Sequence, residues 1–596
     1  MRVGAPSPAE HSESSCRATP LSSIDHPACA GANLPAVASA NLPAVASRCG
    51  YLARVSEPNT PVAATADRKP ARSGGAAALV AAGILLSRLA GFVRQRVFAY
   101  YLGTSAAADA WTAAFRIPNV LQNLLGEGVL SASFIPVYAS LRARGNDKEA
   151  RAVAGAVAGL LGLVTALFAL VGIVATPWLL NAIAPGFDGA TRDLAIQLVR
   201  IFFPGISLLV LSAFCLGVLN SHHRFFLSYA APVVFSLAVI AALLLGGHRH
   251  LGQFPLAVVS AWGAVAGAAL QMAVQVPTVL RLLGPGTRIS LGRGNAQVAE
   301  VVRNFLPVVA GRGVVQLSAY VDAAIASEIG LGTVAAFGYA QLIYTLPVSL
   351  FGMAISAASL PSMSAAQAEE GAQEKLRAQL ASGLRSIAFP VVASVVMFLV
   401  FGDVLCAALF QNGRFGPSEV RYVWLILAGS TVGLLAATMG RLYSSAFYAL
   451  RDTRTPLRFA ILRVTLTLVL GLVCGLWLPR LWGVPRYGAA GLTASAGVAG
   501  WIEFFLLRRS LARRVGPAGV PAGLLLRLWT SAAAAAGIAY GVRLLLERAP
   551  LPRWVLHPVP LAVAVLGTYG AAYFGATLLL QVPEARTMLR RLLRRR

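Results

Sequence analysis

The chain has 596 residues, of which 57% are hydrophobic and only 12% are charged, and its formal net charge is +27. Soluble domains carry about 25% charged residues, so this composition excludes an ordinary soluble protein and predicts that most of the chain lies in lipid. Proteins that bind nucleic acid can be equally basic. Here, however, the basic residues fall in short runs between apolar segments, as the topology of a membrane protein requires.

Residues 1–73 differ in composition from the rest of the chain. They are rich in Ala, Pro and Ser, and they contain the direct repeat ANLPAVAS at 32–39 and 40–47. This composition predicts a disordered N-terminal extension, and no apolar run in it is long enough for a signal peptide. The fold prediction therefore starts at residue 74.

From there to the C-terminus, apolar runs of about 20 residues recur, and each is long enough to cross a hydrocarbon core about 30 Å thick. They predict an all-α polytopic membrane protein with about fourteen transmembrane helices. The predicted spans are 76–101, 107–138, 152–180, 192–219, 227–246, 255–282, 300–328, 334–362, 380–410, 420–448, 456–478, 488–508, 523–544 and 557–581.

The loops between these spans predict the orientation. Every second loop is basic, as at 142–151 and 451–458, whereas the alternate loops, such as 103–107 and 330–333, are short and neutral or mixed. Because basic loops stay on the cytoplasmic side, both termini are expected in the cytoplasm.

A weak internal repeat divides the membrane part. The segments at 217–232 and 445–460 both join a helix end rich in small residues to a short basic turn, about six helices apart. The predicted parts are two six-helix bundles at 74–283 and 284–515, two additional helices at 516–582 and a basic cytoplasmic tail at 583–596.

The first span carries arginines inside its apolar run. Arg88 lies near the centre, and Arg94 and Arg96 follow. An arginine at mid-bilayer costs roughly 2.5–3.5 kcal/mol, so such a residue usually faces a protein-lined cavity, and a cationic cavity implies an anionic passenger. Arg96 lies nearer the outer end and either borders the cavity or extends toward the interface.

The second span has a polar stripe. Its helical spacing places on one face the residues Asp109, Arg116, Asn119, Asn123 and Glu127. Three charged groups favour a cavity lining, although a structural polar seam between helices is the alternative.

A third charged span covers 300–328. Arg312 lies there between two glycines, and Asp322 follows on the same helix. Arg312 either faces the cavity or forms an ion pair with Asp322, since opposite charges inside a membrane tend to pair.

Several motifs in these spans carry a resemblance. The run SRLAGFVRQRVFAYYLGTSAAADAWTAAFRIPN, followed by GEGVLSASFIPVY, resembles the opening of the MurJ (MviN) family of lipid II flippases. GVLNSHHRF at 217–225, LPVSLFGMAISAASLPSMS at 346–364 and FYALRDTRTP at 447–456 also match, in family order. The family belongs to a superfamily that includes polysaccharide flippases and cation-coupled drug exporters.

The resemblance implies a transporter, not an enzyme. Its substrate would be the undecaprenyl-pyrophosphate-linked peptidoglycan precursor, crossing the bacterial cytoplasmic (inner) membrane by alternating access through a central cationic cavity. The two C-terminal helices would guide the lipid tail. Family site residues carry over to Arg88, Arg94 and Asp109, with Asn119 and Glu127 in the same motif. No cofactor or metal is implied, and the coupling ion and any contact with the cell-wall synthesis machinery stay open.

The sequence also departs from the family pattern. Gln122 and Asn123 stand where many members carry a basic pair, and Leu342 and Thr345 replace a basic and an acidic residue. Arg116 and Arg312 are the candidates for replacement positive charge.

Two alternatives come from other classes. An exporter of another lipid-linked oligosaccharide would share the fold, whereas a drug exporter would show an anionic cavity. A membrane enzyme that polymerises glycans would need a carboxylate or histidine site at an interface, usually on a large outer loop. The predicted outer loops are too short for such a site.

Overall fold

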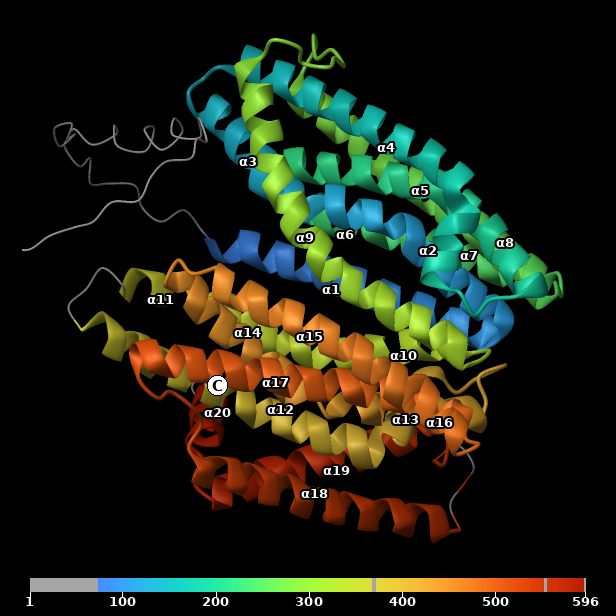
Figure 1. Ribbon diagram of the computed structural model, residues 1–596, viewed down its shortest axis with the longest axis vertical. Helices are drawn as coiled ribbons and strands as arrows, with labels where there is room; N and C mark the ends of the chain where they lie inside the picture. Colours follow the sequence, from blue (N-terminus) through green and yellow to red (C-terminus); the bar gives the residue numbers. More distant parts are fainter. Residues whose placement is uncertain (1–72, 367–370, 551, 553–554, 594–596) are drawn as a thin grey trace, which may run out of the picture. The chain divides into compact units, whose positions relative to one another are not determined.

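The computed structural model of the chain describes residues 73–366, 371–550, 552 and 555–593 (Figure 1). The predicted N-terminal extension therefore lies outside the described residues, apart from Ser73. The side chains of Glu127 and Arg312 also lie outside the described ones. All regular elements in the described ranges are helices, which confirms the predicted all-α class.

The first eight helices form what we call the N-terminal group. They are α1 (Ser73–Leu102), α2 (Ala106–Leu125), α3 (Glu127–Ala143), α4 (Asp147–Ile183), α5 (Gly189–Ser221), α6 (Phe225–Ala230), α7 (Pro232–His248) and α8 (Gln253–Leu283).

The elements from α9 to α17 form the C-terminal group. They are α9 (Ala296–Ile329), α10 (Thr333–Pro347), the π-helix η1 (Val348–Met353), α11 (Ala354–Ala366), α12 (Ala372–Phe410), α13 (Pro417–Thr431), α14 (Leu434–Ala449), α15 (Arg454–Leu472), the π-helix η2 (Val473–Trp477), α16 (Leu478–Leu481), the 3₁₀-helix η3 (Pro485–Tyr487) and α17 (Gly488–Val515). Three helices complete the chain: α18 (Ala522–Arg548), α19 (Pro558–Leu579) and α20 (Pro583–Leu593).

Every predicted span coincides with one helix or with helices in direct succession. In the described ranges, 11 helices are long and apolar enough to cross a membrane, or up to 12 if α13 and α14, which bend by 43°, are one span. Two more, α1 and α9, contain 30 and 34 residues and are also long enough, but they carry charges within their apolar runs.

The second predicted span is wrong in one respect, because it is two helices. The chain leaves the helix at Gly126, whose ψ of −155° is extended, and α3 then begins at Glu127. A side chain at Gly126 would collide with the carbonyl oxygen of Gln122, so only glycine permits this break. The regular helical spacing behind the predicted polar stripe is therefore interrupted between Leu125 and Glu127.

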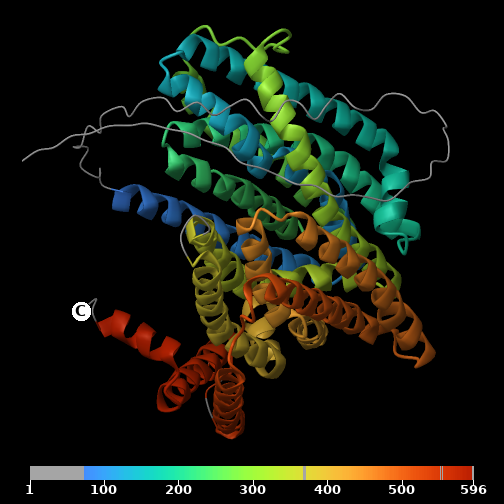
Figure 2. The same ribbon diagram turned by 60° about the vertical axis from the view of Figure 1, so that its left-hand side comes forward.

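The two groups pack mostly within themselves. In the N-terminal group α5 packs against α2, α4 and α8, and in the C-terminal group α17 packs against α13, α14 and α15. Helix α9 contacts both groups: it packs against α3 and α4 on one side and against α10, α15 and α17 on the other (Figure 2).

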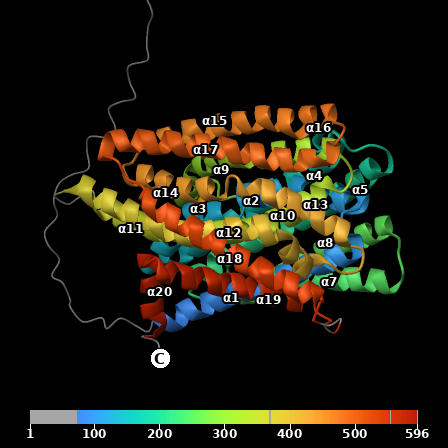
Figure 3. The same cartoon turned by 90° about the horizontal axis from the view of Figure 1, so that it is seen from below.

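The two additional helices α18 and α19 lie beside α12 (Figure 3). Hydrogen bonds from two tyrosine hydroxyls of α19 stabilise this contact. Tyr569 donates to the carbonyl oxygen of Ala393 at 2.8 Å, and Tyr573 donates to that of Phe389 at 2.7 Å.

Candidate functional site

The arginines of α1 reach different neighbours. Arg88 is exposed, and its Nη1 lies 3.5 Å from Ser349 Oγ of η1, across the boundary between the two groups. Arg94 is half-buried and lies 5.4 Å from the ring centroid of Phe235 in α7. At a rise of 1.5 Å per residue, Arg88 lies roughly 21 Å and Arg94 roughly 12 Å along the helix from its end at Leu102.

Asp109 is fully buried, with 0% of its surface exposed. Its carboxylate accepts a hydrogen bond from Gly332 N at 2.5 Å and another from Ala335 N at 2.7 Å. It thereby caps the N-terminus of α10, where free backbone N–H groups and the helix dipole favour an anion. In this conformation Asp109 joins the two groups and is not exposed to a cavity.

We call the region around this contact the closed end, formed by Asp109 and the turns at 103–105, 184–188, 330–332 and 411–416. Tyr339 donates to the carbonyl oxygen of Gly103 at 3.0 Å, and Arg414 N donates to that of Tyr100 at 2.9 Å. Gly332 has a φ of +85°, and a side chain there would collide with the carbonyl oxygen of Thr104. The two groups therefore meet backbone to backbone at this end.

Arg96 belongs to the closed end as well. Its Nη1 donates to the carbonyl oxygen of Ala408 in α12 at 2.9 Å, in a partly buried position. Neither sequence interpretation of Arg96 placed it in such a contact, because a backbone partner on a distant helix leaves no signal in the local sequence.

Arg116 of α2 lies on the side of α9 and α10. Arg116 lies 5.8 Å from the ring centroid of Phe337, and it interacts electrostatically with Asp322. Asn119 and Asn123 are half-buried. The charge of Arg463 also acts on Asp322, and no hydrogen-bond partner of its buried Oδ1 occurs in the described part of the chain. The predicted pairing of Asp322 with Arg312 stays a prediction.

The positions that depart from the family pattern lie on α10. Leu342 is half-buried and packs against the apolar core, and Thr345 is exposed. Among the described side chains, Thr345 Oγ1 accepts a weak hydrogen bond from Gln341 Nε2 at 3.5 Å. These two residues therefore bring no charge to the surface of α10.

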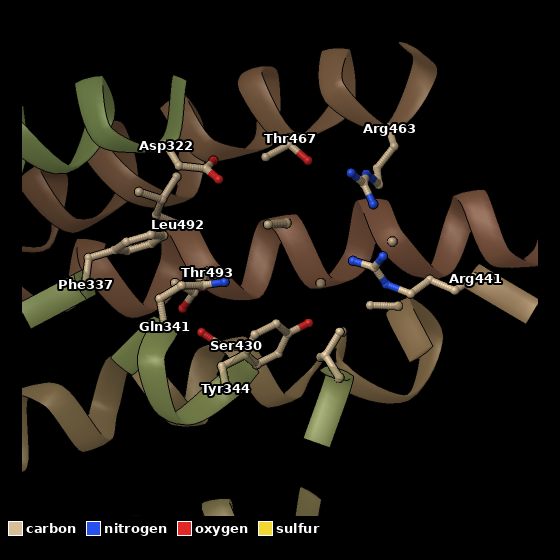
Figure 4. A pocket seen from close by; sticks show the side chains of 16 residues that line it. Asp322, Phe337, Gln341, Tyr344, Ser430, Arg441, Arg463, Thr467, Leu492 and Thr493 are labelled. Atoms are coloured by element: carbon tan, nitrogen blue, oxygen red, sulfur yellow. The ribbon is translucent and has the colours of Figure 1, made fainter. Parts of the chain in front are cut away.

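Three charged residues of the C-terminal group were missed by the sequence interpretation. Arg441 lies in α14, Arg463 in α15 and Glu503 in α17, and all three stand inside apolar runs. The rule that selected Arg88 would have selected them too. Arg463 Nη1 forms an ion pair with Glu503 Oε2 at 3.2 Å, and both arginines line one cavity with Asp322 (Figure 4).

Two groups of membrane-length helices that meet at one end, with arginines inside the helices along their boundary, define the class of polytopic membrane transporters. The arrangement of the chain agrees with solved transporter structures. The inward closed conformation of lipid II flippase MurJ matches with a TM-score of 0.68 and 20% identity over 84% of this chain and 99% of that one. An inward-facing multidrug resistance MATE family transporter matches with a TM-score of 0.59 and 18% identity, over 74% and 98% of the two chains.

Sequence comparison gives the family. The family model described as lipid II flippase MurJ matches residues 98–564. Lipid II flippase MurJ of Burkholderia cenocepacia is 31% identical over 82% of this chain and 94% of its own length. The probable lipid II flippase MurJ of Rhizobium meliloti is 30% identical over 84% of this chain and 93% of its own. The chain belongs to the MurJ family.

Proposed function

We propose that this chain is a flippase that moves lipid II, the undecaprenyl-pyrophosphate-linked peptidoglycan precursor, across the bacterial cytoplasmic membrane. Family membership supports the substrate class. One observation carries the proposal: Arg88 is exposed at the boundary of the two groups, and among the described residues its guanidinium has a single hydrogen bond, the 3.5 Å contact with Ser349. A guanidinium held so weakly at membrane depth is available to a phosphate group, which it can bind with two parallel hydrogen bonds.

The proposed mechanism is alternating access between two bodies, the bundles at 74–283 and 284–515. The closed end keeps the pathway shut on one side of the membrane, while the pyrophosphate binds to Arg88 and Arg94 from the other. Hydrogen bonds to charged groups contribute about 1.5–3 kcal/mol each, so the bonds of Asp109 are strong enough to hold this state and weak enough to be exchanged. The π-helix η1, which contains Ser349, is an irregular segment of the kind often found at functional sites.

The proposal places the closed end on the outer side and both termini in the cytoplasm, because the turns of the closed end are mostly neutral and the opposite turns are basic. Single cysteines test this orientation in a variant without the six native cysteines. A cysteine at Gly145 should resist an impermeant thiol reagent in intact cells, while one at Ser105 should react. Labelling of residue 145 from outside would overturn the orientation.

Two predicted site residues, Glu127 and Arg312, enter the proposal on the sequence pattern alone. Asn119 and Asn123 are proposed to border the same pathway, since they lie half-buried on the helix that carries Asp109. The helices at 516–582 are proposed to accommodate the lipid tail beside α12.

Complementation tests the function. The full chain should restore growth to bacteria depleted of their own lipid II flippase. Arg88→Ala should lose at least about tenfold of the flipping activity at matched membrane abundance, since folding does not depend on the Ser349 contact. Arg88→Lys should keep part of the activity because the charge remains while the two-pronged geometry is lost.

The matched control is Arg458→Ala, which removes an exposed arginine near the start of α15 and changes the net charge equally. This variant should support growth normally. Normal growth with Arg88→Ala at matched abundance would exclude Arg88 as a substrate contact.

A further inference from the structure

A cavity lies inside the C-terminal group, apart from the arginines of α1. It has a volume of about 220 Å³ and is bordered by α9, α10, α13, α14, α15 and α17. Asp322 and Thr467 lie toward one end, and Arg441 and Arg463 point toward each other at the other end (Figure 4).

The two arginines at this end do not have equal partners. Arg463 is neutralised by Glu503 at 3.2 Å, with 36% of the arginine and 16% of the glutamate side chain exposed. Arg441 is exposed, and no hydrogen bond or ion pair of its guanidinium occurs among the described residues. Arg441 instead experiences the like charge of Arg463 and, more weakly, the opposite charge of Glu503. One positive charge therefore remains unneutralised at this end.

Asp322 does not supply the missing partner. It lies at the other end of the cavity, where Arg116 of α2 is the first of the charges that act on it and Arg463 the second. The acid is thus shared with the N-terminal group.

Both arginines lie at membrane depth. Arg441 is eight residues before the end of α14 and Arg463 is nine residues after the start of α15, which places them roughly 12–14 Å from the basic turn between these helices. At this depth a guanidinium without a partner is costly, and a second one beside it raises the cost. A bound anion would remove both costs, and a carboxylate matches the fork of a guanidinium.

We propose that Arg441 and Arg463 form a second anion subsite, which binds a carboxylate on the peptide of the lipid II headgroup. The assignment rests on the proposed function. The cavity holds a small group but not a disaccharide, and its single excess charge suits a carboxylate better than a pyrophosphate. The pyrophosphate is tied to the lipid and stays with Arg88 at the boundary of the groups, while the peptide extends into the C-terminal group.

Binding measurements with the full chain in lipid nanodiscs test this subsite. One titration uses lipid II with free peptide carboxylates, and the other uses lipid II whose peptide carboxylates are converted to amides. The unmodified chain should bind the free acid at least about tenfold more tightly. Arg441→Gln should lose this preference while binding the amide form as before, and Arg441→Lys should keep part of it. Arg458→Gln, with the same loss of charge on the next helix, should keep all of it.

A separate measurement identifies an inorganic occupant. Thermal unfolding of the chain is compared in sodium chloride and in sodium gluconate, and it also reports whether each variant is folded. If chloride raises the unfolding temperature of the unmodified chain, and Arg441→Gln abolishes this effect but keeps the preference for the free acid, the occupant is a small inorganic anion. The peptide assignment is then overturned.

Two other results would also decide against the subsite. Equal binding of both lipid II forms by the unmodified chain overturns the subsite and leaves the proposed function standing. Binding of neither form overturns the proposed function and the subsite together.

Discussion

The closed end and the contact between α1 and η1 both join the two helix groups, but they use different bonds. At the closed end a buried carboxylate accepts two backbone N–H groups at 2.5 and 2.7 Å, and turns meet backbone to backbone. Between α1 and η1 an exposed arginine reaches a serine hydroxyl at 3.5 Å. We infer that a strongly bonded polar residue such as Asp109 holds this conformation, and that a weakly bonded one such as Arg88 is available to a ligand.

The largest effect should follow from Asp109→Ala. Two backbone N–H groups at the start of α10 then lose their buried acceptor, and each donor left without an acceptor destabilises the closed end by about 1–3 kcal/mol. The closed end should therefore open, and flipping should fall by at least about tenfold. Asp109→Asn keeps one acceptor oxygen and should be intermediate.

Thiol labelling reports the opening directly. The reporter is Gly338→Cys, which has room for a side chain beside Thr112 at the α2–α10 contact. In a background without the native cysteines, an impermeant reagent added outside should label this cysteine much faster after Asp109→Ala. Unchanged labelling would show that Asp109 does not hold the closed end.

Arg116 is a predicted substrate-binding residue, but its interaction with Asp322 indicates a structural role. It has Asp322 and the Phe337 ring as neighbours, so we expect Arg116→Ala to strand the carboxylate and to lower membrane abundance several-fold. Adding Asp322→Asn should restore abundance, because the stranded charge is gone. Normal abundance with lost transport, not rescued by the second change, would make Arg116 a substrate contact.

The sequence predicted the helices far better than the role of the charges within them. Apolar length alone placed each predicted span on one helix or on helices in direct succession, because a bilayer requires helices of similar length. Position on a helix also selected Arg88, which lies at the boundary between the two groups. It could not foresee that Asp109 binds the backbone of α10, more than 200 residues away. The break at Gly126 was not predicted either, because its extended ψ angle depends on the packing of both flanking helices.

A fully paired arginine should behave opposite to Arg88. Arg543 of α18 forms ion pairs with Asp403 of α12 at 2.8 Å and with Glu547 at 2.9 Å. Only 22% of the Arg543 side chain and 21% of the Asp403 side chain are exposed. Arg543→Ala should lower the free energy of unfolding by about 1–3 kcal/mol, while each folded molecule keeps its flipping rate. Thermal unfolding measures the change in stability, and an assay in proteoliposomes measures the flipping rate. Adding Asp403→Ala to Arg543→Ala should recover part of the stability. Loss of flipping at normal stability would contradict the structural role.

The smallest effect concerns His222, in the turn after α5. Its Nε2 lies 2.9 Å from the hydroxyl oxygen of Tyr138. Burial, followed by the nearby Arg142, lowers the pKa of His222 below its ordinary value; His223 and Arg224 act in the same direction and Asp147 opposes them. The folded chain therefore binds the proton less readily than the unfolded chain. The neutral ring contributes its full stability above the ordinary pKa of about 6.5, and this contribution is lost as the pH falls through the lower folded value.

His222→Gln removes the titration and keeps a side chain that can bond to Tyr138, so it should flatten the fall in unfolding temperature between pH 8 and mildly acidic pH. His557→Gln, at an exposed histidine before α19, is the control and should leave the pH dependence unchanged. The effect should be small because the turn lies outside the membrane-spanning helices. An equally steep fall in His222→Gln would show that another group, and not this histidine, carries the acid sensitivity of the basic turns.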